Sequence, residues 1–260
     1  MYRIEKMNKV FFVILCMVIV HSYGLVMPQD PRDLFPESIP AEGPYRTMLF
    51  EENTKFINKT IQMTTINSTS RSLTECSMIC IRYFCLGFFF NSEQSSCALT
   101  HARFYNQNVT TNRIGSRYYL TFHESCPSDQ GYVYYPSENF CVKLNTTQVI
   151  YPETQYYCVL ERASIVRVDS VKKFNILQNL LVNQGYNQAN DFAYIMSQPI
   201  SLSNNYAFID GTVMPYYNWM SGKPDSNGQR IAIGGTTQQF DDVNEMELHG
   251  FICEKYIYKN

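Results

Sequence analysis

The chain has 260 residues, of which 45% are hydrophobic, 15% aromatic and only 17% charged. This length suffices for the core of one large domain or two small ones, and the apolar content excludes a wholly disordered chain. Abundant aromatic residues with few charges favour strands over long solvated helices. The formal net charge is −2 and no basic block occurs, so nucleic-acid binding through phosphate neutralisation is disfavoured.

The N-terminus predicts export from the cell. Basic residues precede an apolar run at 10–20, and Ser22 and Gly24 follow at the spacing of a small-residue cleavage site, which predicts a secretory signal peptide at 1–24. A transmembrane anchor is the alternative, but the run is too short to cross about 30 Å of hydrocarbon. We therefore expect a secreted, extracellular protein with no membrane span.

The cysteines agree with secretion. Nine are present, one of them in the predicted signal peptide, and the other eight fall into two groups of four separated near residue 124. An even number in a secreted chain indicates disulfides, although the number alone does not fix their pairing. A zinc site is disfavoured because the first four lack a C-x2-C pair. Four N-x-Ser/Thr sequons predict a glycoprotein, at Asn58, Asn67, Asn108 and Asn145.

Five prolines at 25–44 predict an extended leader, and residues 45–122 form the first predicted domain. Ser72-x-x-Glu75 has the spacing of a capping box and predicts a short helix that ends near Arg82. Cys76 and Cys80 then share one helical face and do not pair easily with each other. Strands are expected at 46–50, 85–91, 97–99 and 116–121.

These residues resemble an apple/PAN module. The similarity lies in Cys76-x3-Cys80, in Cys85 followed by Gly-Phe-Phe-Phe, and in Cys97-Ala-Leu after a polar turn. The resemblance implies the nested bridges Cys76–Cys97 and Cys80–Cys85, which tie the helix to the hairpin. The pair that joins the two ends of true apple domains is missing. Such modules bind proteins or sugars and carry out no chemistry.

Residues 124–260 form the second predicted domain. Cys126 and Cys141 bound a hairpin that their own disulfide could close, and Pro152 predicts the start of a helix that runs to Arg162. A short strand at 164–168 follows. Ser170 is the expected N-cap of a second helix that Gly185 ends. Its apolar residues recur at helical spacing, at Val171, Phe174, Leu177 and Leu181. Beyond Asp191 only short strands and a long polar loop are expected, which indicates an α+β fold.

A series of short motifs in this region resembles a long-form C-type lectin-like domain. Each motif is soft, but all stand in the family's order over about 130 residues. They are Tyr151-x2-Thr154-x3-Cys158, residues 163–170, Phe192–Ile195 in place of WIGL, Phe208–Gly211, Trp219–Asp225, Phe240–Asp242 in place of WND, and Gly250–Lys255. The resemblance implies a bridge Cys158–Cys253 across the domain and a hairpin bridge Cys126–Cys141. The family's second internal bridge, between positions near Ile231 and Glu245, has lost both cysteines.

In the sugar-binding members of that family, polar residues on both sides of a cis-proline bind calcium and the sugar. Carried over, the site residues are Lys223, Asp225, Gln229, Asp241 and Asp242, around a cis Pro224. Asp225 matches the galactose-type motif, and Gln229 offers an amide oxygen in place of Glu. Tyr216 and Tyr217 are candidates to stack on a sugar, whereas Trp219 is expected in the core.

Lys223 leaves two alternatives open, because an ammonium group donates hydrogen bonds and cannot bind a metal ion. Either Lys223 turns outward and calcium, bound by Asp225, Gln229, Asp241 and Asp242, is retained, or the lysine replaces calcium. Asp-Ser-Asn-Gly at 225–228 is also ordinary turn chemistry.

We expect a recognition protein that binds carbohydrate, more galactose-type than mannose-type, with glycans or glycoproteins as partners. The alternative is a calcium-independent protein-binding or adhesion module without sugar binding. No enzyme is expected: HExxH, G-x-S-x-G and phosphate-binding glycine loops are all absent from the sequence. Glu245 and Glu247 near Asp241 and Asp242 only weakly suggest glycoside hydrolysis.

Overall fold

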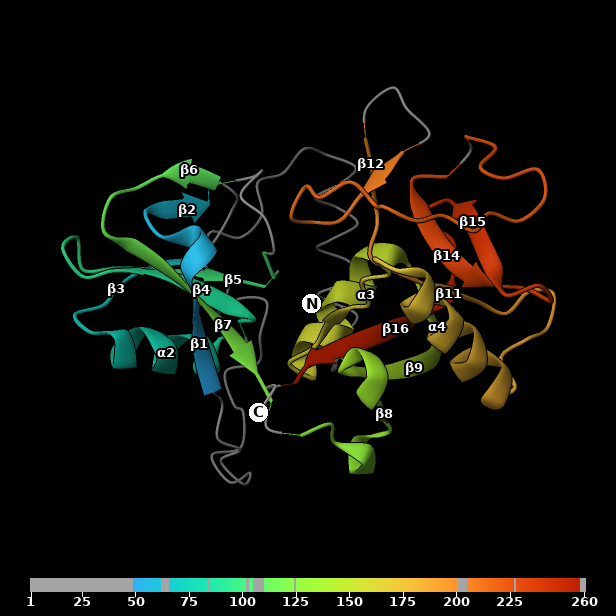
Figure 1. Ribbon diagram of the computed structural model, residues 1–260, viewed down its shortest axis with the longest axis horizontal. Coiled ribbons are helices and arrows are strands. Elements are labelled where there is room, and N and C mark those ends of the chain that lie inside the picture. Colours follow the sequence, from blue (N-terminus) through green and yellow to red (C-terminus); the bar gives the residue numbers. More distant parts are fainter. Residues whose placement is uncertain are drawn as a thin grey trace, which may run out of the picture. The chain divides into compact units, whose positions relative to one another are not determined.

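The computed structural model of the protein describes residues 49–61, 66–83, 85–101, 103–104, 110–123, 125–200, 205–226 and 228–257. The predicted signal peptide (1–24) and proline-rich leader (25–44) lie outside the described residues. Helices and strands alternate irregularly in an α+β arrangement with two larger sheets (Figure 1). Among the described residues, no helix is long and apolar enough to cross a membrane.

The first sheet is antiparallel, with the strand order β1-β7-β4-β5-β3. The strands of this sheet are β1 (Leu49–Asn53), β3 (Ile66–Thr69), β4 (Gly87–Asn91), β5 (Ser96–Thr100) and β7 (Ser116–Phe122). Two further strands, β2 (Lys59–Ile61) and β6 (Thr110–Asn112), form a separate antiparallel pair. A 3-10 turn, η2 (Thr54–Phe56), links β1 to β2. β4 is central and buried along its whole length, because apolar clusters cover both of its faces.

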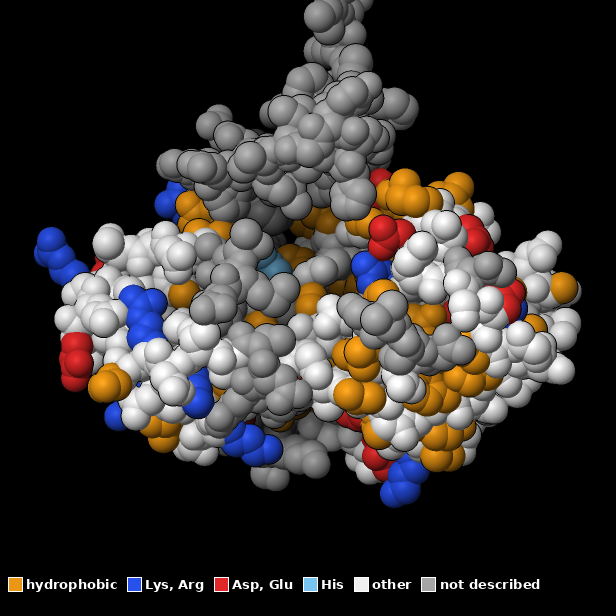
Figure 2. Space-filling model, turned by 90° about the horizontal axis from the view of Figure 1, so that it is seen from above, with side chains coloured by type: hydrophobic (Ala, Val, Ile, Leu, Met, Phe, Trp, Pro, Cys, Tyr) orange, Lys and Arg blue, Asp and Glu red, His pale blue; other side chains and the backbone are white. Residues whose placement is uncertain are grey.

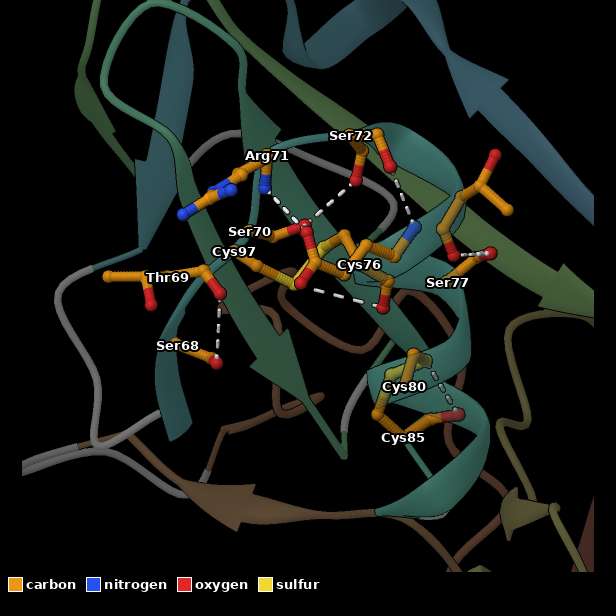
Figure 3. The surroundings of a disulfide bond; sticks show 12 residues. Ser68, Thr69, Ser70, Arg71, Ser72, Cys76, Ser77, Cys80, Cys85 and Cys97 are labelled. Atoms are coloured by element: carbon orange, nitrogen blue, oxygen red, sulfur yellow. Dashed lines mark hydrogen bonds between the residues drawn. A yellow bond between two sulfur atoms is a disulfide. The ribbon is translucent and has the colours of Figure 1, made fainter.

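Helix α2 (Leu73–Arg82) covers one face of this sheet, and its start follows the expected capping chemistry. The Ser72 hydroxyl accepts a hydrogen bond from Glu75 N (3.1 Å). The Glu75 carboxylate accepts a bond from Arg71 N (2.7 Å), one residue before the position of an ordinary capping box. Local sequence therefore fixes where the helix begins. Figure 3 shows Arg71 and Ser72 at this end of α2.

Two disulfides join α2 to the strands beneath it. Cys76 is bonded to Cys97 on β5, and Cys80 to Cys85 just before β4 (Figure 3). All four residues are fully or almost fully buried in one apolar cluster. Gly87 is needed where β4 passes β7, because a Cβ atom there would lie 2.6 Å from the Tyr118 hydroxyl.

The second sheet has the order β15-β14-β11-β16-β9-β8, and β10 pairs with β16. β11 and β16 are parallel and the other neighbours antiparallel. Its strands are β8 (Val133–Tyr135), β9 (Phe140–Val149), β10 (Ser164–Ile165), β11 (Phe192–Tyr194), β14 (Arg230–Gly234), β15 (Gln239–Val243) and β16 (His249–Tyr256). A small pair, β12 (Gln198–Pro199) and β13 (Tyr206–Ala207), and 3-10 turns η3 (Ser128–Gln130) and η4 (Pro136–Glu138) complete this part.

Helices α3 (Tyr151–Leu160) and α4 (Val171–Asn183) precede the short strands, in the expected order. Ser170 caps α4 by accepting a bond from Lys173 N (3.2 Å), and Gly185, at φ +70°, follows its end. Of the apolar residues at helical spacing, Phe174, Leu177 and Leu181 are buried, whereas Val171, in the first turn, is exposed.

Two further disulfides occur in this part, Cys126–Cys141 and Cys158–Cys253. The second joins α3 to the central strand β16. All four bridges connect cysteines within one group of four.

Two expected strands differ in extent. Of the strand expected at 46–50, residues 46–48 lie outside the described residues, and β1 extends beyond residue 50 to Asn53. The strand expected at 164–168 is limited to Ser164–Ile165. Val166 N still donates to Ile252 O on β16 (2.9 Å), but Arg167 N donates to the Glu254 carboxylate (3.0 Å) rather than to a strand carbonyl, so the backbone pairing ends there.

A substitution at Leu177 on α4 tests the packing of the apolar core around the second sheet. It is fully buried, whereas Val182 on the same helix is exposed. Leu177→Ala should lower the free energy of unfolding by about 2–5 kcal/mol through lost apolar contact and a cavity. Val182→Ala should change it by about 0.5 kcal/mol or less. Urea denaturation checks both, and equal effects would contradict this packing.

Candidate functional site

The candidate site lies between the segment that follows Trp219 and the edge strand β15. The Lys223–Pro224 peptide is cis, as expected from the sequence. Hydrogen bonds between backbone groups fix the approach to it, because Met220 N donates to Phe240 O (2.9 Å) and Phe240 N to Asn218 O (2.8 Å). Lys223 and Asp225 thereby face Asp241 and Asp242 on β15.

The Lys223 ammonium group is at the centre of this site. Its Nζ lies 2.8 Å from Asp241 Oδ1, 3.1 Å from Asp225 Oδ2 and 3.9 Å from Asp242 Oδ1. The close contact with Asp241, and then the hydrogen bond to Asp225, raise the pKa of Lys223 above its usual value despite partial burial. The ammonium therefore remains charged throughout the neutral range and offsets part of the negative charge of the three carboxylates.

Asp242 is buried and holds the neighbouring loop by its backbone. Its carboxylate accepts hydrogen bonds from Asp225 N (3.0 Å) and Gly228 N (3.3 Å). A Cβ atom at Gly228 would lie 2.3 Å from the Asp242 backbone, so only glycine permits this approach. The Tyr206 hydroxyl donates to Gly228 O (3.1 Å), and burial, with Asp242 nearby, raises its pKa to about 12.

Gln229 lies at the side of this site, not among the three aspartates. Its backbone N donates to Val243 O (3.0 Å), and its side-chain oxygen accepts a long bond from Glu245 N (3.5 Å). Within the described part of the chain, no group of three or more His, Cys, Asp or Glu side chains is arranged to hold a metal ion.

The aromatic candidates pack onto the core. The Tyr217 ring stacks on Trp219 with 5.4 Å between centroids, and its hydroxyl bonds to the backbone of Tyr206. Tyr216 contacts Phe174 and Phe240 edge-on. Trp219 is half-buried against Phe240, in line with a structural role.

Sequence reasoning missed an ion pair at the positions near Ile231 and Glu245, where the lectin-like resemblance places a bridge whose two cysteines this chain lacks. Arg230 Nη2 lies 2.9 Å from Glu245 Oε2, and the same guanidinium covers the Tyr151 ring and donates to Ser197 O (3.2 Å). Tyr151 N in turn donates to Glu245 O (2.9 Å). The sequence offered one signal, opposite charges at the two positions next to the missing cysteines.

The four sequons differ in surroundings. Asn58 and Asn67 are exposed, on a turn and on edge strand β3. Asn145 is half-buried on β9, and its oxygen accepts a bond from Thr147 N (3.0 Å). Asn108 lies outside the described residues.

The chain matches no protein-family model. It is similar to the mouse scavenger receptor C-type lectin carbohydrate-recognition domain, with 18% identity over 52% of this chain and 99% of that one, at a TM-score of 0.44. A calcium-independent type II antifreeze protein shares 16% identity over 52% and 96%, at a TM-score of 0.42. SPL-1 in complex with GlcNAc shares 17% identity over 52% and 97%, at a TM-score of 0.44.

The ion pair between Arg230 and Glu245 should contribute to holding β14 against the turn after β15. Glu245→Gln should lower the free energy of unfolding by about 1–2 kcal/mol, because it leaves a partly buried guanidinium without a carboxylate. Hydrogen exchange should accelerate in 228–231. The exposed pair Lys172–Glu138 is the control: Lys172→Met should cost about 0.5 kcal/mol or less. An unchanged exchange rate in Glu245→Gln would show that the pair holds nothing.

Proposed function

We propose that residues 124–260 form a C-type lectin-like recognition domain that binds its ligand without calcium. The observation that carries this proposal is the position of the Lys223 ammonium, within 2.8–3.9 Å of three carboxylates. In the sugar-binding lectins a calcium ion is expected among the corresponding residues. Here a protonated amine already provides the positive charge, and it belongs to the protein itself.

The residues present do not fit a calcium ion. Calcium takes six to eight oxygen ligands, but Lys223 has no acceptor atom and repels a cation. Asp242 directs its carboxylate to two backbone N–H groups, and Gln229 lies at the side of the aspartates. Binding calcium would require the lysine to leave two short contacts and the loop to release Asp242.

Protein recognition is the function that this geometry favours, in keeping with an adhesion module. Sugar binding by the family's route needs the calcium ion as a bridge, and the aromatic rings best placed to stack on a sugar are engaged with Trp219 and Phe240. A loop fixed by its own ion pairs instead presents a rigid surface, and rigid surfaces lose little entropy on binding.

Direct carbohydrate binding is the second candidate. Asp225 is partly exposed and lies 3.1 Å from Lys223, so an acceptor and a donor stand side by side at the surface. Such a pair suits adjacent sugar hydroxyls. Because Asp225 matches the galactose-type motif, galactose-type sugars are the expected ligands. In this case also, the binding would not depend on calcium.

The remaining sequence expectations complete the proposal. Residues 45–122 are an apple/PAN-like module, consistent with a helix joined to a β-hairpin by Cys76–Cys97 and Cys80–Cys85. The chain is secreted and glycosylated, and its eight cysteines outside the predicted signal peptide are oxidised. Its role is recognition, not catalysis.

Calorimetry with Lys223→Gln tests the proposal. Wild type should show no calcium binding, and the variant should gain weak binding, with a Kd of about 10⁻⁴–10⁻³ M, because three carboxylates are left without a cation. Lys172→Gln, an exposed lysine on α4, is the matched control and should resemble wild type. A glycan array with calcium or chelator should give the same signals.

Calcium binding by wild type, abolished together with glycan binding in Asp242→Ala, would overturn this proposal in favour of a calcium-dependent lectin. If neither protein binds calcium, the aspartates were wrongly carried over from the family, and Lys223 only holds the loop.

A further inference from the structure

Two surfaces outside the Lys223 site each combine exposed apolar side chains with uncompensated charge. The charge is positive on one surface and negative on the other. The first, here called the basic tip, consists of residues 57–59 and 112–115. Its two turns are locked together by three bonds of 2.8 Å: Asn58 N donates to Ser116 O, Arg113 N to Asn58 O, and Gly115 N to Asn58 Oδ1. The tip is therefore a rigid platform rather than two independent loops.

Neutral partners hold the cations of the basic tip. Lys59 Nζ donates to Asn112 Oδ1 (2.6 Å), and Arg113 Nε donates to Gln94 Oε1 (2.8 Å). Among the described residues, neither cation forms an ion pair with a carboxylate. Glu93, beside Gly115, offsets only part of the charge. The amides fix both side chains in place and leave their charge available to an outside partner.

The same tip exposes two large apolar side chains. Ile114 is 77% and Ile57 48% exposed, on turns that are bonded to each other. A rigid apolar pair beside cations is typical of the centre and rim of a protein interface.

The second surface, here called the acidic turn, consists of residues 244–248 between β15 and β16. Met246 is 55% and Leu248 59% exposed, on either side of Glu247. Asn244 N donates to Glu247 Oε1 (3.0 Å), and the Tyr194 hydroxyl bonds to the carbonyl groups of Asn244 and Glu247. This turn is therefore fixed by its own hydrogen bonds.

The charge of Glu247 is not neutralised. The His249 ring lies 3.3 Å from its carboxylate, but burial lowers the pKa of His249, so the ring is uncharged at neutral pH. The opposite signs extend beyond these turns. The described residues at 49–122 include seven basic and four acidic side chains, and those at 125–257 include eight and thirteen. Blue side chains predominate over the first part and red over the second in Figure 2.

We propose that the basic tip of one copy of this chain binds the acidic turn of a second copy. The apolar pair of each surface meets that of the other, and Arg113 and Lys59 face Glu247. The contact is heterologous, so each copy in a pair retains one free surface and assembly continues beyond the dimer as concentration rises. With few residues on each side, the affinity is weak.

Sedimentation velocity of the full secreted chain over a range of concentrations tests this contact. Wild type should self-associate reversibly, and added salt should weaken the association. Arg113→Glu and Glu247→Lys should each weaken it by about tenfold or more, because like charges then face each other. Arg82→Glu, the same charge change at the far end of α2, should leave it unchanged.

Mixing and combining the two variants separates this arrangement from others. An equimolar mixture of Arg113→Glu and Glu247→Lys should associate, because each variant keeps the surface that the other lacks. The double variant should recover self-association, with its charges exchanged. An N-glycan on Asn58 would stand beside Ile57, so the experiment is repeated after enzymatic glycan removal, which should strengthen the contact.

Three results would overturn the proposal. One is a monomer at every concentration with and without glycans. Another is self-association that neither charge reversal weakens. The third is single variants that stay monomeric when mixed and when combined in one chain, since this would show that the reversals act through something other than a tip-to-turn contact.

Discussion

The candidate site depends on one ammonium group that stands among three carboxylates. Without a cation, Asp225, Asp241 and Asp242 would repel one another across the edge of the second sheet. The loop after Pro224 would then lose the ion pairs that hold it against β15. Lys223 supplies the charge from within the chain, with contacts of 2.8 and 3.1 Å to two of the three. The folded chain therefore supplies the cation of this site from its own sequence.

A second ion pair lies near the Lys223 site, at positions where the lectin-like resemblance places a disulfide. The resemblance places a second internal bridge between positions near Ile231 and Glu245, where this chain has no cysteines, and Arg230 and Glu245 form an ion pair there. The remaining covalent restraints, Cys126–Cys141 and Cys158–Cys253, hold the hairpin and the centre of the sheet. The loop region of this part is thus held by ion pairs and backbone hydrogen bonds, while the hairpin and the central strand β16 are held by disulfides.

Much of this fold was accessible from the sequence because its signals are local. Ser72 and Ser170 cap helices through bonds to residues three positions away, and Gly185 ends α4 with a left-handed backbone. Strand limits were less accessible, because the end of β10 is set by Glu254, which is distant in sequence. The sequence named the candidate calcium ligands, but it did not predict which group the aspartates would contact. The sequence left open whether Lys223 turns outward or inward, and only the approach of β15 places Asp241 within its reach.

The ammonium resonance of Lys223 tests the central claim most directly. In nitrogen-15 spectra of the labelled protein at neutral pH, a lysine held by two carboxylates should give an ammonium signal protected from fast exchange, assigned by its loss in Lys223→Gln. Our account predicts that this signal is present and does not change when calcium is added. A signal that shifts or disappears on calcium addition would show that the metal displaces the lysine, and the account would be contradicted.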